Sequence, residues 1–428
     1  MTRPPARETI FALSSGALPA AIAIVRISGA AAGAVLAGLA GALPPPRRAR
    51  ATRLMAQDGS LLDHALVLWC PGPRTATGED LVELHLHGGR AVVAAVLDAV
   101  GRDPRCRPAA PGEFTRRAFA NGRIDLAEAE GLADLLSAET ERQRQQALRL
   151  AEGGLGRMID RWRTRLLAMT AAIEAELEFG EDEEDVPPSA AALDEKGRIL
   201  ADEVAAALAQ PPAERLRDGI RVVLAGPVNA GKSSLLNALV GREAAIATAV
   251  AGTTRDLVEV PVARDGIAFL LIDSAGLRDT DDAVERIGIA RATDAVGQAD
   301  LVLWLGAAED APRRGGVIRI AAQVDRRDAT DPGAIATSAV TGHGIEDLWS
   351  VLIARAGELL PAENSLALNV RHREALRDVV TELGRVSSDP ILRAEHLRAA
   401  LAALDRVTGR AGVEDMLDAL FGQFCIGK

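Results

Sequence analysis

Residues 221 to 234 read RVVLAGPVNAGKSS, and this stretch decides the fold of the middle of the chain. A short β-branched run leads into a loop, 226 to 233, that matches GxxxxGK[ST] and precedes a helical segment, 234 to 240. Glycines let the backbone N–H groups of such a loop fold around phosphate at a helix N-terminus. In that arrangement Lys232 reaches the terminal phosphates and the Ser233 hydroxyl binds Mg²⁺. The stretch therefore predicts a P-loop nucleotide-binding domain of α/β type.

Further nucleotide-site motifs follow in chain order. A switch-loop sequence, 252 to 256, would supply Thr254 to Mg²⁺, and an apolar strand, 268 to 272, ends at the DxxG sequence DSAG. Asp273 would hold Mg²⁺ through water, and the Gly276 amide would sense the γ-phosphate. The predicted GTP-binding residues are Asn229, Ala230, Gly231, Lys232, Ser233, Ser234, Thr248, Ala249, Val250, Ala251, Gly252, Thr253, Thr254, Asp273, Ser274, Ala275, Gly276, Asp325, Ser338 and Ala339.

Two positions depart from the usual GTPase pattern. The NKxD position reads AQVD at 322 to 325, so Asp325 is kept to pair with guanine N1 and N2 while the Asn and the Lys are missing. This predicts a lower nucleotide affinity and a weaker selection of guanine. Leu277 stands after DxxG, where Ras-like proteins use a Gln to orient the attacking water. Another residue must orient the water. Without one, the protein would be a nucleotide switch that barely hydrolyses GTP.

Composition limits the possible functions. The chain has 428 residues, 48% of them hydrophobic, which favours two to three folded domains. Its 3 cysteines exclude a disulfide framework and, with no signal peptide and no apolar run of membrane-spanning length, predict a cytoplasmic protein. The formal charge of -11 argues against a protein that coats nucleic acid. An arginine-rich segment, 142 to 165, is either a local RNA contact or a solvated helix face.

Patterning along the chain indicates a multidomain α/β and α+β protein. Residues 1 to 120 mix strand-like runs with Pro and Gly turns and predict a compact α+β domain. Helical spacing begins at Asp125, which forms a capping-box pattern with Glu128. We expect a helical domain at 121–216 and 358–428, interrupted by an inserted GTPase domain at 217–357.

Several motifs make the whole chain resemble the MnmE (TrmE) family of tRNA-uridine-modifying GTPases. They are VRISG at 25 to 29, TGEDLVEL at 77 to 84, HGG at 87 to 89, PGEFT at 111 to 115, RAF at 117 to 119, GTTRD at 252 to 256, VERIG at 284 to 288 and the terminal FCIGK at 424 to 428. The FCIGK tail beside an inserted GTPase is the most specific of these.

The resemblance implies a homodimer that works with an FAD-dependent MnmG-type partner as a heterotetramer. That complex would install an aminomethyl-type group, such as carboxymethylaminomethyl, at C5 of the wobble uridine of certain tRNAs. A tetrahydrofolate derivative, 5,10-methylene or 5-formyl, would donate the carbon and bind to the N-terminal domain, which would also dimerise. Arg26, Glu83, Arg123 and Lys428 match the family's folate-contacting positions, with Arg at 123 where relatives more often have Lys.

The resemblance also implies how water is activated. A potassium ion would stand where an arginine finger stands in other GTPases, held by Asn229, Thr248, Val250 and Thr253. Glu285, beyond DxxG, would orient the water and act with Asn229 as the catalytic pair when two GTPase domains meet. The Mg²⁺ ligands would be Ser233 and Thr254.

Other interpretations stay open. The chain could be a translation or ribosome-assembly GTPase switch without folate chemistry, or a folate-binding scaffold that has lost nucleotide binding. Glu83, His85 and His87 share one strand face by period two, as a metal site or as a polar surface. Cys425 is either a functional thiol or a packed core residue.

Overall fold

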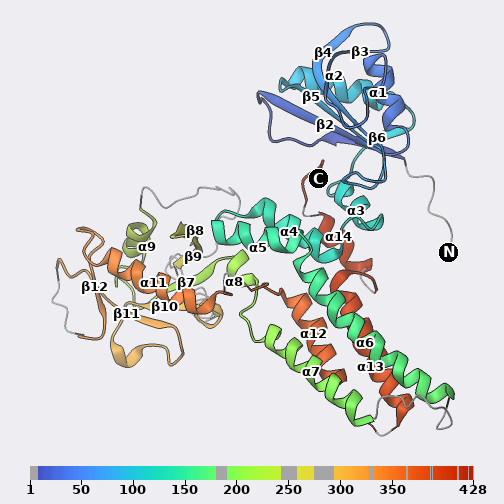
Figure 1. The fold of residues 1–428 in the computed structure, drawn as a ribbon. Coiled ribbons are helices and arrows are strands. Elements are labelled where there is room, and N and C mark those ends of the chain that lie inside the picture. Colours follow the sequence, from blue (N-terminus) through green and yellow to red (C-terminus); the bar gives the residue numbers. More distant parts are fainter. Residues whose placement is uncertain are drawn as a thin grey trace, which may run out of the picture. The chain divides into compact units, whose positions relative to one another are not determined.

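The computed structural model describes residues 8–179, 190–241, 258–273, 294–326, 331–362, 365–385, 387, 389–411, 414–422 and 424–427 (Figure 1). Contacts divide the chain into two compact units, and neither is one continuous segment. The first is built from 1–133, 150–161 and 404–428, and the second from 134–149 and 162–403.

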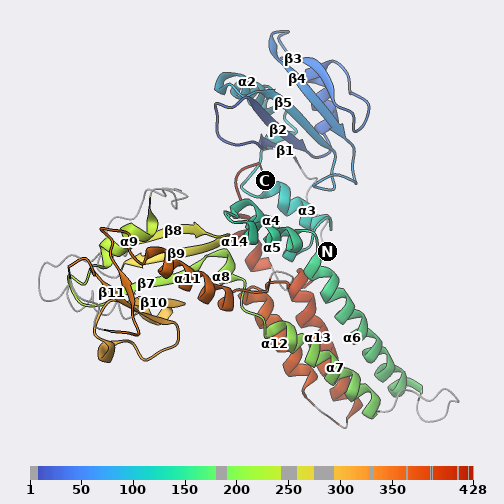
Figure 2. The same cartoon turned by 60° about the vertical axis from the view of Figure 1, so that its left-hand side comes forward.

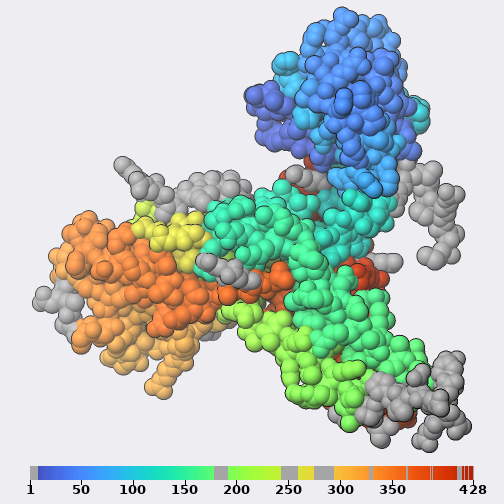
Figure 3. All heavy atoms as spheres, in the orientation of Figure 1, coloured from blue at the N-terminus to red at the C-terminus, as the bar shows by residue number. Residues whose placement is uncertain are grey.

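The first unit begins with a sheet domain, which packs as one rounded body (Figure 3, blue). Its six-stranded sheet has the order β3-β4-β5-β2-β1-β6, in which only β1 and β6 pair in parallel. The elements are β1 (Thr9–Leu13), β2 (Ile22–Ser28), α1 (Ala32–Ala40), β3 (Arg50–Met55), β4 (Leu61–Cys70), β5 (Leu81–His87), α2 (Arg90–Gly101) and β6 (Cys106–Pro108).

One face of this sheet is buried and the other is open. Alternate residues of β2 and β5, such as Val25 and Leu84, are fully buried in one cluster with residues of α1 and α2. Both helices therefore cover the same face. Because side chains alternate along a strand, the residues between them, Arg26, Glu83 and His85, stand on the face opposite α1 and α2.

A buried ion-pair network joins the sheet domain to α3 (Glu113–Ala120). Arg117, whose side chain is 9% exposed, donates to Glu79 at 3.0 Å and to Glu113 at 2.9 Å. Burial alone would raise the pKa of Glu113, but hydrogen bonds from Arg107, the Ala110 N–H and Arg117 outweigh it and lower the pKa to about 2. The network fixes the segment that follows the sheet.

The C-terminal segment returns to the sheet domain. Phe421, within α14 (Glu414–Gly422), and Phe424, just after it, pack against α4 (Leu126–Ser137) and α3. Ile426 forms a bridge with Pro111, and the Ser14 hydroxyl donates to the Gly427 carbonyl at 2.8 Å. The residues near the end of the chain therefore lie at the β1–β2 loop.

Long helices form much of the second unit. They are α6 (Gly154–Phe179), which begins in the first unit, α7 (Ala190–Leu208), α12 (Val370–Leu383) and α13 (Pro390–Thr408), and they run side by side in both ribbon views (Figure 2). Asn369 starts α12 as an N-cap, accepting from the His372 N–H. Arg373 donates to the Leu208 and Gln210 carbonyls, which satisfies the C-terminal end of α7.

A short helix connects this bundle to the inserted domain. In α5 (Glu141–Ala151), the Gln143 side chain, 9% exposed, accepts from the Thr140 N–H and donates to the Leu216 and Arg217 carbonyls at the end of α8 (Glu214–Arg217). Gln146 donates to the Ser365 carbonyl on the exit side. Helix α5 thus contacts both the segment that leads into the inserted domain and the segment that leaves it.

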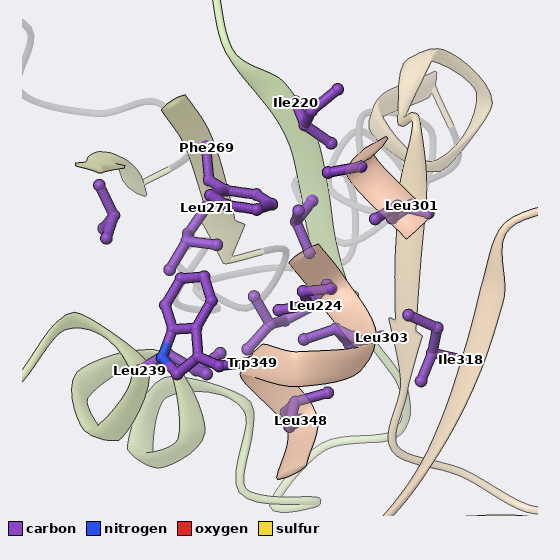
Figure 4. Close-up of a cluster of buried hydrophobic side chains, with 14 of the residues drawn as sticks. Ile220, Leu224, Leu239, Phe269, Leu271, Leu301, Leu303, Ile318, Leu348 and Trp349 are labelled. Carbon is purple, nitrogen blue, oxygen red and sulfur yellow. The ribbon is translucent and has the colours of Figure 1, made fainter. Parts of the chain in front are cut away.

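The inserted domain is a mostly parallel sheet with the strand that carries the P-loop near its middle. The described strands run β12-β11-β10-β7-β9-β8, and β8 is antiparallel to its neighbour. Phe269 and Trp349 meet edge to face at 5.3 Å in its core (Figure 4). The elements are β7 (Ile220–Ala225), α9 (Lys232–Val240), β8 (Val258–Arg264), β9 (Ile267–Asp273), β10 (Leu301–Trp304), η2 (Ala308–Asp310), β11 (Val317–Ala322), β12 (Ile335–Thr337) and α11 (Ile345–Leu359).

The predicted capping box at Asp125 is confirmed, and it carries a half-buried carboxyl. The Asp125 carboxylate accepts from the Glu128 N–H at 2.7 Å, and the Glu128 carboxylate accepts from the Asp125 N–H at 2.7 Å. Burial raises the pKa of Asp125 from 3.8 to about 6. The folded state therefore favours the protonated form, and this stabilisation is complete below about pH 4 and lost as the pH rises through about 6.

We predict that Asp125→Asn removes this pH dependence, because an amide oxygen still caps α4 and the half-buried charge is gone. Hydrogen exchange of the α4 amides, expressed as protection factors, should show the wild type less protected at pH 7.5 than at pH 5 and the variant equally protected. Asp98→Asn, which changes an exposed carboxylate of the same unit, is the control. An unchanged pH dependence in Asp125→Asn would contradict the prediction.

Candidate active site

The loop between β7 and α9 has a backbone with several positive φ angles. Gly226, Asn229 and Gly231 take φ values of 146°, 62° and 98°, all in the region that favours glycine. Lys232 is 6% exposed and its ammonium group donates to the Gly226 and Pro227 carbonyls at 2.8 Å each. Burial lowers the pKa of Lys232, and the charge of Asp273 opposes that shift. The lysine is thus held at the loop, as the motif predicts.

Ser233 and Asp273 meet at the carboxyl ends of two neighbouring strands. β7 and β9 pair in parallel with Leu224 opposite Asp273, which sets Asp273, 3% exposed, at the start of α9. The Ser233 hydroxyl donates to the Asp273 carboxylate at 2.6 Å. A hydroxyl and a carboxylate are hard oxygen ligands of the kind that Mg²⁺ prefers, so this pair fits the predicted ion.

The predicted base-binding residues also lie together. The Ser338 hydroxyl donates to the Asp325 carboxylate at 2.6 Å, and this hydrogen bond lowers the pKa of Asp325. The Val324 N–H donates to the Thr337 carbonyl at 3.2 Å, which ties the loop after β11 to the end of β12. Gln323 has a φ of 62°, and its side-chain nitrogen lies 3.1 Å from where a Cβ on Gly231 would be. Sequence reasoning identified Gln323 as a departure but missed that its side chain lies beside the P-loop.

The remaining nucleotide-site predictions lie outside the described residues. They are Thr248, Ala249, Val250, Ala251, Gly252, Thr253, Thr254, Ser274, Ala275, Gly276, Leu277 and Glu285.

A second group of predicted residues lies on the open face of the first unit's sheet. Arg26 and Glu83 are paired at 2.8 Å, and their side chains are 26% and 20% exposed. Burial alone would raise the pKa of Glu83, but the hydrogen bond and charge of Arg26 outweigh it and lower the pKa. The Arg26 guanidinium also lies over the Phe114 ring, 6.0 Å from its centroid. This face offers a cation, a carboxylate and an aromatic ring side by side.

The other predicted folate residues surround this pair less directly. Arg123 is exposed and lies beside Gly78, where an added Cβ would be 3.1 Å from the Arg123 Cγ. Ser28, two residues after Arg26, holds the neighbouring loop through the Thr77 hydroxyl at 2.8 Å and the Glu79 carboxylate at 2.9 Å. Sequence reasoning missed this hydroxyl network, although TGED marks a turn there. Lys428 lies outside the described residues.

The histidines of β5 divide between two partners. His85 lies 3.4 Å from the Glu83 carboxylate, whereas His87 pairs with Asp63 of β4 at 2.7 Å. Within the part of the chain that the structure describes, no group of three His, Cys, Asp or Glu residues could hold a metal ion. Cys425 is exposed, so the alternative of a packed core thiol is wrong.

Comparisons with known proteins cover the chain from end to end. The model of the GTP-binding protein TrmE N-terminus matches residues 9–123, and the model of the MnmE helical domain matches 126–425. The tRNA modification GTPase MnmE of Rhizorhabdus wittichii is 58% identical over 99% of this chain and 97% of its own length. That of Erythrobacter litoralis is 54% identical over 98% of this chain and 100% of its own.

A solved G domain is similar to part of this chain. The G domain of the T. maritima FeoB iron transporter is 28% identical, over 32% of this chain and 98% of that chain, with a TM-score of 0.24. Among the described helices, none combines the length and the apolar character needed to cross a bilayer.

Two family models that together match nearly the whole chain, and relatives more than half identical over almost its full length, agree with a P-loop domain inserted into a helical one. The chain belongs to the MnmE family of tRNA modification GTPases, and its enzymatic activity is GTP hydrolysis.

Proposed function

We propose that this chain is the GTPase subunit of a complex that modifies C5 of the wobble uridine in tRNA. GTP is hydrolysed to GDP and phosphate, and a one-carbon tetrahydrofolate and an FAD-dependent MnmG-type partner take part in the modification. The observation that carries the proposal is the presence in one chain of a P-loop site and of a separate Arg26–Glu83 face. A GTPase that acts only as a switch has no need of the second site.

At the GTPase site, each described side chain has a role that its contacts support. Ser233 and Asp273 would hold Mg²⁺, with Thr254 as a further ligand, and the ion would neutralise phosphate charge. Lys232 would exchange its two carbonyl contacts for phosphate oxygens, which keep its ammonium group fully hydrogen-bonded. Asp325, fixed by Ser338, would accept from guanine N1–H and N2–H.

Potassium and Glu285 would complete the site. Asn229 lies in the loop with a left-handed backbone and is exposed, and it would hold K⁺ with Thr248, Val250 and Thr253. Glu285 would orient the hydrolytic water, a role that Leu277 cannot take. Two GTPase domains of a homodimer would close the site.

The open sheet face would bind folate and a second copy of the chain. Arg26 suits the glutamate carboxylates of a folate, and Glu83 suits the N–H groups of a pterin. Ile22 and Leu66, 60% and 42% exposed on this face, are apolar side chains that a homodimer would cover. A cytoplasmic heterotetramer of two such chains and two MnmG-type partners follows from this proposal.

The function is tested directly by the nucleosides of tRNA. Mass analysis of wobble uridines from a strain without this gene should show loss of the aminomethyl-type C5 group, restored by the wild-type gene and not by Lys232→Ala. If the modification persists in the deletion strain, the alternative of a translation or ribosome-assembly switch is favoured instead.

We predict that hydrolysis needs potassium and Glu285. The rate should be high in K⁺ and low in Na⁺ for the wild type, and Asn229→Ala should remove the difference. Glu285→Ala should lower the rate by about 10²-fold, as expected for loss of a group that positions the nucleophile, with nucleotide affinity nearly unchanged. Equal wild-type rates in the two salts would rule out the potassium site.

For the folate face, we predict that Arg26→Gln and Lys428→Ala each weaken 5-formyltetrahydrofolate binding by 10-fold or more, because each loses a charged contact. Isothermal titration calorimetry on the full chain measures the affinity. Arg53→Gln, an exposed arginine on edge strand β3, should bind as the wild type does. Removal of residues 424 to 428 should abolish binding. An unchanged affinity in Arg26→Gln, in Lys428→Ala and in the truncated chain would refute the pocket.

A further inference from the structure

One edge of the first unit's sheet carries arginines that have no acidic partner. Arg48 and Arg50 lie at the start of edge strand β3, and Arg74 lies in the loop after β4 (Figure 2). All three are exposed, and among the described residues none of their guanidinium groups forms an ion pair or a hydrogen bond with another residue. We call Arg48, Arg50 and Arg74 the arginine patch.

The arginine patch differs in charge from the rest of the protein. Several other arginines of the same unit pair with carboxylates, as Arg102 does with Asp98 and Arg105 with Asp103, each at 2.7 Å. The whole chain has a formal charge of -11, so a group of unpaired cations is a local exception. Like charges repel one another, and a bound anion would remove that repulsion.

Arg47 holds the two parts of the arginine patch together. Its N–H donates to the Trp69 carbonyl at 2.7 Å, which joins the segment before β3 to the end of β4. Its guanidinium group donates to the Pro71 carbonyl at 3.4 Å and to the Arg74 carbonyl. Arg47 has a φ of 59°, in the region that favours glycine, so its surroundings must maintain this conformation. The loop that carries Arg74 is therefore fastened beside the start of β3.

The arginine patch is separate from the Arg26–Glu83 face. Arg50 and Leu54 lie on the same face of β3, because side chains alternate along a strand, and Leu54 is buried in the cluster with α1 and α2. Arg53 stands on the other face, directly opposite His64 of β4. The patch can therefore be changed without changing the pair proposed to bind folate.

We propose that the arginine patch binds the phosphate backbone of tRNA. The inference rests on the proposed function and names the surface of this chain that contacts the RNA. Arginine forms paired, charge-assisted hydrogen bonds with phosphate oxygens, and each neutralised phosphate releases counterions. Contacts to phosphates carry no sequence information, so the patch positions the tRNA and does not select the wobble base. A protein of net negative charge can bind RNA in this way because the contact is local.

The test measures how tightly the full-length chain binds a tRNA transcript with an unmodified wobble uridine. Fluorescence anisotropy gives the dissociation constant from about 50 to about 200 mM KCl, a range over which phosphate contacts weaken steeply. The triple variant Arg48→Gln/Arg50→Gln/Arg74→Gln should bind about 10-fold more weakly, or worse, at the lower salt concentration. Its plot of log K against log[KCl] should be less steep by about 2, since each phosphate contact contributes roughly 0.7–0.9 to the slope.

A matched control removes the same charge from another part of the protein. Arg313→Gln/Arg355→Gln/Arg377→Gln changes three exposed arginines of the second unit and should keep the wild-type slope. A patch variant that binds tRNA as the wild type does overturns the proposal, and so does a control variant that loses as much affinity as the patch variant.

Charged residues on an edge strand can also prevent it from pairing with a second sheet. Light scattering and thermal unfolding of every variant distinguish this role from RNA binding. Self-association of the patch variant with an unchanged affinity for tRNA would assign the arginines to edge protection and overturn the proposal. If the triple variant self-associates too strongly to be titrated, the three single variants decide, each with about a third of the expected change in slope.

The deletion strain separates this proposal from the function on which it rests. The patch variant should restore less of the wobble-uridine modification than the wild-type gene does. If the modification persists in the deletion strain, the proposed function is wrong, and tRNA affinity alone judges the patch. If the wild-type gene restores the modification and the patch variant restores it equally with unchanged tRNA affinity, the function stands and the patch is overturned.

Discussion

The parallel pairing of β7 with β9 is the constraint on which the nucleotide site depends. It sets Leu224 opposite Asp273, so that a carboxylate from one strand and a hydroxyl from the helix after the other come within 2.6 Å. The strands are buried, and a shift of register would expose their apolar residues or bury polar ones. The hydrophobic core of the inserted domain therefore fixes the metal-binding geometry. The parallel pairing of β11 with β12 likewise places Asp325 and Ser338 together, in the loops that follow these two strands.

The sheet of the first unit uses its two faces differently. Both of its helices cover one face, which leaves Arg26 and Glu83 partly exposed on the other. An open face with a charged pair and nearby apolar side chains is costly to leave in water unless something covers it. The N-terminal domain thus presents its polar side chains on a sheet face, whereas the inserted domain gathers them in the loops at the ends of its strands.

The sequence predicted those features that depend on residues close together along the chain. The strand expected at 268 to 272 lies within β9 and the helix expected at 234 to 240 lies within α9, and the capping box at Asp125 is found as expected. Contacts between distant residues were not predictable in this way. The Arg117–Glu79 pair and the hydrogen bond of Ser14 to Gly427 join residues whose spacing carries no period. The three-residue strand β6 is also too short to give a signal.

The return of the C-terminal segment has a consequence for synthesis on the ribosome. The first compact unit includes 1–133 but also 404–428, so its last part leaves the ribosome only after the whole second unit has been made. Domains usually fold in order as they emerge, yet this one stays without the bridge at Pro111 and the Ser14 contact until residues 404–428 have been made. The inserted domain, continuous in sequence and held at both ends by α5, can close first. A truncated chain would accordingly carry an intact P-loop domain and an unfinished N-terminal one.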